Sequence, residues 1–186
     1  GGTTDIAVIS LGGKVKSTSV KIAGNTFDDE IQKYVRMKFN VAIGLRTAEE
    51  LKKQVACCRP CEFSAEMEVK GRSLLTGLPQ RLTIAPGDLY EANMPLAEQI
   101  EVASHQVLAR TPPELAGDIY SAGVVLTGGG SKLKGLDEYL SQQLKVKVRV
   151  SDDPINCVAL GTARCLEIGD QLESGFVDAT PRLGHR

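Results

Sequence analysis

GVVLTGGGSKLKGLDEYLSQQL, residues 123–144, places an apolar run, three consecutive glycines and an amphipathic segment in that order. The apolar run predicts a strand and the amphipathic segment predicts a helix. A strand that enters a helix through glycines lets a ligand approach the backbone beside the positive helix N-terminus, which suits nucleotides. A tight strand-to-helix turn explains Gly128, Gly129 and Gly130 equally well. The stretch therefore favours an α/β fold and leaves the ligand open.

Strand and helix patterns alternate on both sides of this stretch, in the order of an α/β layer architecture. Asp28, Asp29 and Glu30 are expected near the positive end of a helix that starts at Phe27. Thr47 and Glu50 have the spacing of a capping box, which predicts the start of the next helix. The expected strands are 4–10, 14–22, two short runs within 66–84, and 146–150; the expected helices are 27–39, 47–56, 86–110 (interrupted or bent near Pro95), 111–123 and 154–168; residues 169–186 are expected to fray.

Composition excludes several classes of function. The 186 residues carry 22 Lys and Arg against 23 Asp and Glu, a formal net charge of −1, so no basic excess points to nucleic acid. The apolar runs are shorter than the roughly 20 residues that cross a bilayer, and no signal-peptide pattern opens the chain. We expect a cytoplasmic protein.

The five cysteines are odd in number and unevenly placed, which argues against a disulfide framework. Cys57, Cys58 and Cys61 cluster in the segment CCRPC, whose single C-x-x-C could supply two zinc ligands. No second pair and no nearby histidine completes a set of four. Reduced loop cysteines are therefore the preferred interpretation, and no metal site is predicted.

Two further segments could contact a ligand. Gly1, Gly2, Thr3 and Thr4 put glycines and hydroxyls at the start of a hairpin, where backbone N–H groups can hold phosphate oxygens. In the predicted helix of T-A-E-E-L-K, Glu49 and Lys52 lie three residues apart and therefore on one face. The carboxylate could accept from a ribose hydroxyl and the lysine could cover sugar and base. An exposed ion pair on a solvated helix is the alternative.

Six segments resemble, in order and spacing, the C-terminal half of the MreB family of bacterial cell-shape proteins. The resemblance covers Gly1 to Glu167. MEVKGRSLLTGLP and TPPELAGDI are the most specific segments, because other members of the actin and Hsp70 superfamily share only the glycine loops. The segments are GGTTDIAVISLGG, AGNTFDDEIQKYV, IGLRTAEELKKQV, MEVKGRSLLTGLP, TPPELAGDIYSAGVVLTGGGSKLKGLDEYL and DDPINCVALGTARCLE.

The resemblance implies one half of an actin-like (ribonuclease H-like) ATPase domain with a smaller α+β subdomain inserted. Residues 1–25 and 110–167 would form the larger nucleotide-binding subdomain, residues 26–109 the smaller one, and 168–186 a tail. It also implies ATP and Mg²⁺ in a cleft between two domains, and filaments that lie on the inner face of the cytoplasmic membrane and guide cell-wall synthesis. Partners would be further subunits and membrane proteins of cell-wall elongation.

The resemblance also implies roles for residues at three places. Gly1, Gly2 and Thr3 would belong to the second phosphate loop; Glu49, Glu50, Leu51 and Lys52 would contact adenosine; Gly128, Gly129, Gly130 and Ser131 would border the base and sugar. The first phosphate loop, the residues that organise magnesium and attacking water, and the membrane-binding segment would lie outside this chain. No catalytic residue is therefore expected here, and hydrolysis depends on both walls of the cleft.

Two departures from the family pattern stand out: Leu45 replaces a usual glutamate, and CCRPC replaces a loop rich in Gly, Pro and acidic residues. Two other functions stay open at this stage. One is half of an Hsp70-like chaperone ATPase, against which MEVKGRSLLTGLP argues. The other is a non-enzymatic module that keeps filament surfaces without the ATPase. The chain is expected to begin inside a phosphate loop, at GGTT. The sequence upstream of Gly1 would therefore distinguish these functions, because an intact first phosphate loop there would favour an ATPase.

Overall fold

The computed structural model describes residues 1–60 and 66–167 of the chain. Its elements follow the order β1 (Thr4–Ser10), β2 (Gly13–Val20), α1 (Gly24–Phe39), β3 (Val41–Ala42), α2 (Leu45–Gln54), β4 (Met67–Ser73), β5 (Pro79–Ile84), α3 (Pro86–Ala109), α4 (Pro113–Ala122), β6 (Val124–Leu126), the 3₁₀ helix η1 (Gly129–Lys132), α5 (Leu136–Leu144), β7 (Val148–Val150) and α6 (Cys157–Glu167). Every predicted strand and helix within the described residues is present. The predicted tail 169–186 and Cys61 lie outside them.

Within the described residues, the strands form three small sheets. β1 and β2 pair antiparallel through a two-residue turn, in which Leu11 and Gly12 both have positive φ, as a type I′ hairpin turn requires. β3, β4 and β5 form an antiparallel sheet, with Val41 opposite Ser73 and Met67 opposite Ile84. β6 and β7 run parallel, with Val124 opposite Val148.

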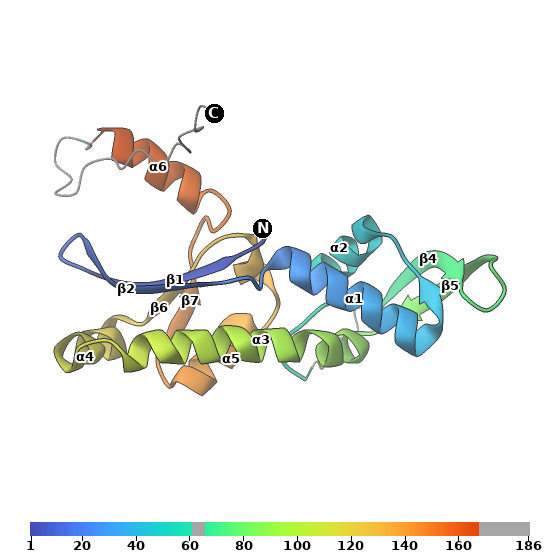
Figure 1. Ribbon diagram of the computed structural model, residues 1–186, viewed down its shortest axis with the longest axis horizontal. Coiled ribbons are helices and arrows are strands. Elements are labelled where there is room, and N and C mark those ends of the chain that lie inside the picture. Colours follow the sequence, from blue (N-terminus) through green and yellow to red (C-terminus); the bar gives the residue numbers. More distant parts are fainter. Residues whose placement is uncertain (61–65, 168–186) are drawn as a thin grey trace, which may run out of the picture.

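Helix α3 connects the two ends of the molecule. It is continuous for 24 residues and runs along the length of the molecule below the hairpin and α1 (Figure 1). It contacts α1 as well as β1, β2 and α5. Pro95 lies inside the helix without ending it, so the predicted interruption is wrong, and the predicted alternative of a bend stays a prediction. Because α3 touches elements of both predicted subdomains, their boundary at residue 109 stays a prediction.

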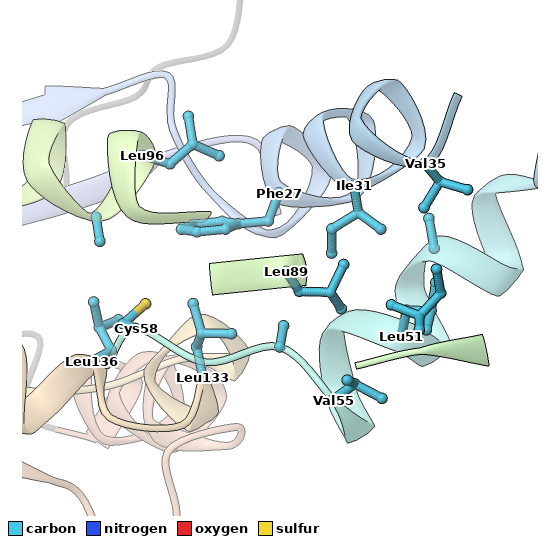
Figure 2. Packing of buried hydrophobic residues seen from close by; sticks show 14 of the residues in the cluster. Phe27, Ile31, Val35, Leu51, Val55, Cys58, Leu89, Leu96, Leu133 and Leu136 are labelled. Carbon is cyan, nitrogen blue, oxygen red and sulfur yellow. The ribbon is translucent and has the colours of Figure 1, made fainter. Parts of the chain in front are cut away.

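The core is built from helix faces with apolar residues one turn apart. Phe27, Ile31 and Val35 recur every four residues on α1, and all three are buried. Figure 2 shows them facing Leu51 of α2 and Leu89 of α3. The same cluster continues through Cys58 to Leu133 and Leu136, so one core joins α1, α2, α3 and the segment around α5.

Both predicted starts of α1 and α2 are too late. α1 begins at Gly24, because the Ala23 N–H donates to the Thr26 hydroxyl and the Thr26 and Phe27 N–H groups donate to the Ala23 carbonyl. No acidic residue lies in its first turn. α2 begins at Leu45, where the chain turns from extended to helical at Gly44 directly after β3. Thr47 therefore lies inside the helix, and the predicted capping box is wrong.

The cysteine prediction is partly wrong. Cys57 is disulfide-bonded, whereas Cys58, Cys157 and Cys165 are free. Cys58 is only 1% exposed and packs in the core beside Leu136, and this burial raises the pKa of its thiol to about 12. A buried thiol of this kind behaves as a small apolar side chain.

No helix of the described residues combines the length and the apolar character that crossing a bilayer demands.

Candidate functional site

The N-terminal glycines lie against the start of α1. The carbonyl of Gly1 accepts from the N–H of Asn25 at 3.3 Å, and the Thr3 hydroxyl donates to the Asp5 carboxylate at 3.3 Å. A Cβ atom added to Gly1 or Gly2 would meet nothing within 4 Å. The loop is therefore anchored on one side and open on the other, which leaves its backbone accessible to a ligand.

Lys52 extends from α2 to this same place. Its ammonium donates to the Gly24 carbonyl at 2.9 Å and to Asp28 Oδ2 at 2.8 Å, and it lies 2.8 Å from Asp28 Oδ1. A Cβ built on Gly24 would be 3.3 Å from Lys52 Nζ and 3.8 Å from the Gly1 nitrogen. The lysine ammonium thus lies at the start of α1, and the space beside the Gly24 Cα borders both this ammonium and the Gly1 nitrogen.

Glu49 takes a partner other than Lys52. Its carboxylate forms an ion pair with Lys53 at 2.6 Å, one turn further along α2. The hydrogen bond and the charge of Lys53 lower the pKa of Glu49, with smaller contributions from Lys52 and the N-terminal ammonium. Glu49 is exposed and carries a negative charge that points away from the core. Lys52 and Glu49 lie on one helix face as predicted, but they do not pair.

The two residues between them have structural contacts. Glu50 pairs with Arg46 at 3.3 Å on the exposed side of α2. Leu51 is completely buried and packs in the core (Figure 2). Any contact of Leu51 with a ligand would have to come from its backbone.

The glycine run forms a hydrogen-bonded turn after β6. Gly128 has a φ of +79°, and its N–H donates to the Pro154 carbonyl at 2.6 Å. Ser131 is buried, and its hydroxyl donates to the Gly128 carbonyl at 2.7 Å. Added Cβ atoms at Gly128, Gly129 and Gly130 would meet nothing within 4 Å. The turn leads into η1 rather than directly into an α-helix, and α5 begins only at Leu136.

Contacts from Lys134 connect this turn to the end of α2. The Lys134 ammonium donates to the carbonyl of Gln54, two residues after Lys52, and its own carbonyl accepts from the Cys58 N–H at 2.8 Å. The structure therefore joins the segment after the glycine run to α2, and joins α2 to the start of α1, which in turn holds Gly1.

Two open hollows among the described residues lie elsewhere. One of about 440 Å³ is lined by hairpin residues such as Asp5, Lys14 and Ser19, and one of about 140 Å³ lies between β2 and the end of α3. None of the predicted nucleotide residues lines either cavity.

Sequence reasoning missed Asp28 and Gly24, the two groups that hold Lys52 in place. Asp28 appeared only as one acidic residue among three. Its partner lies 24 positions away, so no local spacing links the two residues.

Comparisons with known proteins agree with this architecture. The MreB/Mbl protein family matches residues 1–174. The chain is 46% identical over 172 residues to the cell shape-determining protein Mbl of Bacillus subtilis, covering 92% of this chain and 52% of that protein. It is 42% identical over 170 residues to the cell shape-determining protein MreB of Escherichia coli, covering 91% and 49%. The chain spans about half the length of the curated relatives it matches.

Solved structures show the same fold. MreB5 of Spiroplasma citri bound to AMPPNP superposes with a TM-score of 0.87 at 36% identity, over 94% of this chain and 53% of that one. The MamK double helical filament gives a TM-score of 0.71 at 23% identity, over 89% and 51%, a likeness that concerns the fold alone. The family match settles the choice against an Hsp70-like ATPase. With residues 1–174 matched and nearly half of the aligned residues identical to Mbl, this chain belongs to the MreB/Mbl protein family.

Proposed function

We propose that this chain forms one wall of an ATP site in an MreB-like filament protein. The observation that carries the proposal is the place of Lys52, whose ammonium donates to the Gly24 carbonyl at the start of α1, where the open N-terminal loop is also anchored. A lysine N–H donor near an open glycine loop suits a nucleotide, which brings polar sugar and base groups as well as phosphate oxygens. The proposal is supported by the structure of MreB5 bound to AMPPNP, which shares this fold at 36% identity.

The proposal assigns a chemical role to each segment. Gly1, Gly2 and Thr3 would hold phosphate oxygens with backbone N–H groups and a hydroxyl. Glu49 would accept from the ribose, because its lowered pKa keeps it ionised at neutral pH. Lys52 would lie over the adenosine. The open side of the turn Gly128–Ser131 would border base and sugar, where the missing Cβ atoms leave space.

Magnesium would enter with the phosphates. Among residues 1–60 and 66–167, no three His, Cys, Asp or Glu side chains gather to hold a metal ion. The proposal therefore assigns magnesium to the ATP phosphates and to groups beyond the described residues. It assigns no catalytic residue to this chain.

At the level of the whole protein, we propose ATP-linked polymerisation. Nucleotide would bridge two domains and fix the subunit shape, and the subunits would form filaments in the cytoplasm at the inner face of the cell membrane. The filaments would guide cell-wall synthesis together with membrane proteins of cell-wall elongation. The relatives Mbl and MreB, which are named for determining cell shape, support this proposal.

Equilibrium dialysis of Mg–ATP against the chain tests the ATP site. Replacing both Glu49 and Lys52 by alanine removes two charge-assisted contacts and should weaken ATP binding at least tenfold. The matched control replaces Glu68 and Arg81, an exposed ion pair on β4 and β5, and should leave affinity unchanged. If the first variant retained saturable binding, Glu49 would be only the exposed partner of Lys53 and Lys52 only the enclosed partner of Asp28, neither with a ligand. A wild-type chain that binds no ATP would favour the non-enzymatic filament module.

A further inference from the structure

We propose that Asp28 is a positioning residue of this ATP site, which holds the Lys52 ammonium at the start of α1, where the N-terminal glycine loop is anchored. The inference rests on the proposed function, which places Lys52 in the ATP site. It adds Asp28 as the residue that holds this lysine. Asp28 belongs to α1 and does not itself face the glycine loop through any described contact. Its effect on the ligand would be exerted through Lys52.

The Asp28–Lys52 pair differs from the other ion pairs of the chain in its burial. The two side chains are 12% and 17% exposed, whereas Glu49 and Lys53 are 48% and 64% exposed. Among the ion pairs of the described residues, none is more enclosed. Asp28 as a whole is 8% exposed, and its Oδ1 has no hydrogen bond besides the ionic contact with Lys52. A buried carboxylate of this kind depends on its lysine for compensation.

The geometry leaves one donor of the ammonium for a ligand. A lysine ammonium has three N–H donors. Asp28 takes one at 2.8 Å and the Gly24 carbonyl takes one at 2.9 Å. The third N–H donor is left for a ligand. The space beside the Gly24 Cα borders both the Lys52 ammonium and the Gly1 nitrogen.

Fixing the lysine in this way favours binding. A free lysine side chain has several rotatable bonds, and ordering it on binding costs free energy. Here the pair Asp28 and Gly24 has already ordered the side chain, so the ligand gains its contact without that cost. Ligand contact would in turn strengthen the link between α1 and α2, since both helices hold the same ammonium.

A double-mutant cycle read out by Mg–ATP dialysis tests the inference. Asp28→Asn keeps the shape and removes the charge, and Lys52→Gln removes the ammonium. We expect each single variant to lose about tenfold in ATP affinity, and the double variant to lose no more than Lys52→Gln alone, because both changes act on one contact. Glu30→Gln, the same change of charge on the same helix, should leave ATP affinity unchanged.

A purely structural role is separated by a second control. Ile31→Val destabilises the same helix without touching the pair, and it should lower the thermal midpoint while ATP affinity stays within twofold. Two results would overturn the positioning role. In the first, Asp28→Asn and Ile31→Val lose the same ATP affinity for the same loss of stability. In the second, the affinity losses of Asp28→Asn and Lys52→Gln are additive.

A measurement without nucleotide keeps the inference independent of the ATP assay. Amine acylation followed by peptide mass spectrometry should label Lys53 readily and Lys52 slowly in the wild-type chain. Asp28→Asn should raise Lys52 labelling several-fold and leave Lys53 labelling unchanged. Unchanged Lys52 labelling would refute the hold of Asp28 on the lysine. If Lys52 labelling rose as expected in Asp28→Asn but the wild-type chain bound no ATP, the Asp28–Lys52 contact would be confirmed. The proposed function, and with it the role of Asp28 in binding, would be overturned.

Discussion

The backbone of Gly71 in β4 packs directly on the side chain of Val41 in β3. A Cβ atom added to Gly71 would lie 2.4 Å from Val41 Cγ1 and 2.6 Å from the Ala42 carbonyl oxygen. Val41 is fully buried, and neither a backbone carbonyl nor a β-branched side chain in a core can move aside freely. The glycine of MEVKGRSLLTGLP therefore allows the two strands to approach each other.

Replacing Gly71 with alanine should destabilise the chain. Overpacking at such a position costs about 1–3 kcal/mol, which urea denaturation would detect as a lower midpoint at an unchanged m-value. Gly117→Ala in α4 is the matched control, because its added Cβ meets nothing within 4 Å. Alanine inside a helix should raise stability there by about 0.5–1 kcal/mol. Equal effects of the two variants would contradict the close packing of β3 and β4.

Asn93 is the buried polar residue whose removal should stabilise the fold. It is completely buried on α3, and neither its amide nitrogen nor its oxygen has a hydrogen-bond partner. An unsatisfied buried polar group costs about 1–3 kcal/mol, so Asn93→Leu, which keeps the same branched shape with apolar atoms, should increase the free energy of unfolding by up to about that amount. Asn93→Asp should do the opposite, since it buries a charge in the same place. A destabilised Asn93→Leu chain would show that the amide has a partner in solution.

Cys58 should resist thiol reagents as long as the chain is folded. The thiolate is the reactive form, and burial raises the pKa of this thiol to about 12, so at pH 8 almost none is ionised. With Ellman's reagent at pH 8, Cys157 and Cys165 should react in the folded chain and Cys58 only after urea unfolds it. Cys58→Ala should remove only the slow fraction. Rapid reaction of Cys58 without denaturant would place it outside the core.

Gly24→Ala should weaken ATP binding without unfolding the protein. The added methyl group would lie 3.3 Å from Lys52 Nζ, and the end of a lysine side chain can shift by a few tenths of an ångström at little cost. The ammonium would then be displaced from its position at the start of α1, and we expect a loss of about two- to fivefold in ATP affinity with a change in stability within about 0.5 kcal/mol. Gly87→Ala, near the start of α3 in open space, is the control and should leave ATP affinity unchanged.

The elements could be predicted from sequence because their signals are local. The alternation in β1 and β2, the four-residue spacing of Phe27, Ile31 and Val35, and the glycine run before α5 all depend on near neighbours. Helix starts were less predictable, because Ala23 and Gly44 carry no capping side chain and the hydrogen bonds of Thr26 are visible only in the folded backbone.

The partners of the site residues could not be predicted, for a different reason. Glu49 has lysines at both three and four residues' distance, and sequence spacing alone does not choose between Lys52 and Lys53. Lys52 pairs with Asp28 because the packing of α1 on α2 brings them together, and that packing depends on the whole core. Pairing across helices is a tertiary property.

The single continuous α3 also determines how the chain comes apart. Helix α3 contributes Leu89 to the core and also contacts the β1–β2 hairpin. If either of these regions unfolded alone, it would expose apolar surface of α3. Melting should therefore be a single cooperative transition across the described residues. A protease cut within α3 should therefore destabilise both the core around Leu89 and the packing of the β1–β2 hairpin.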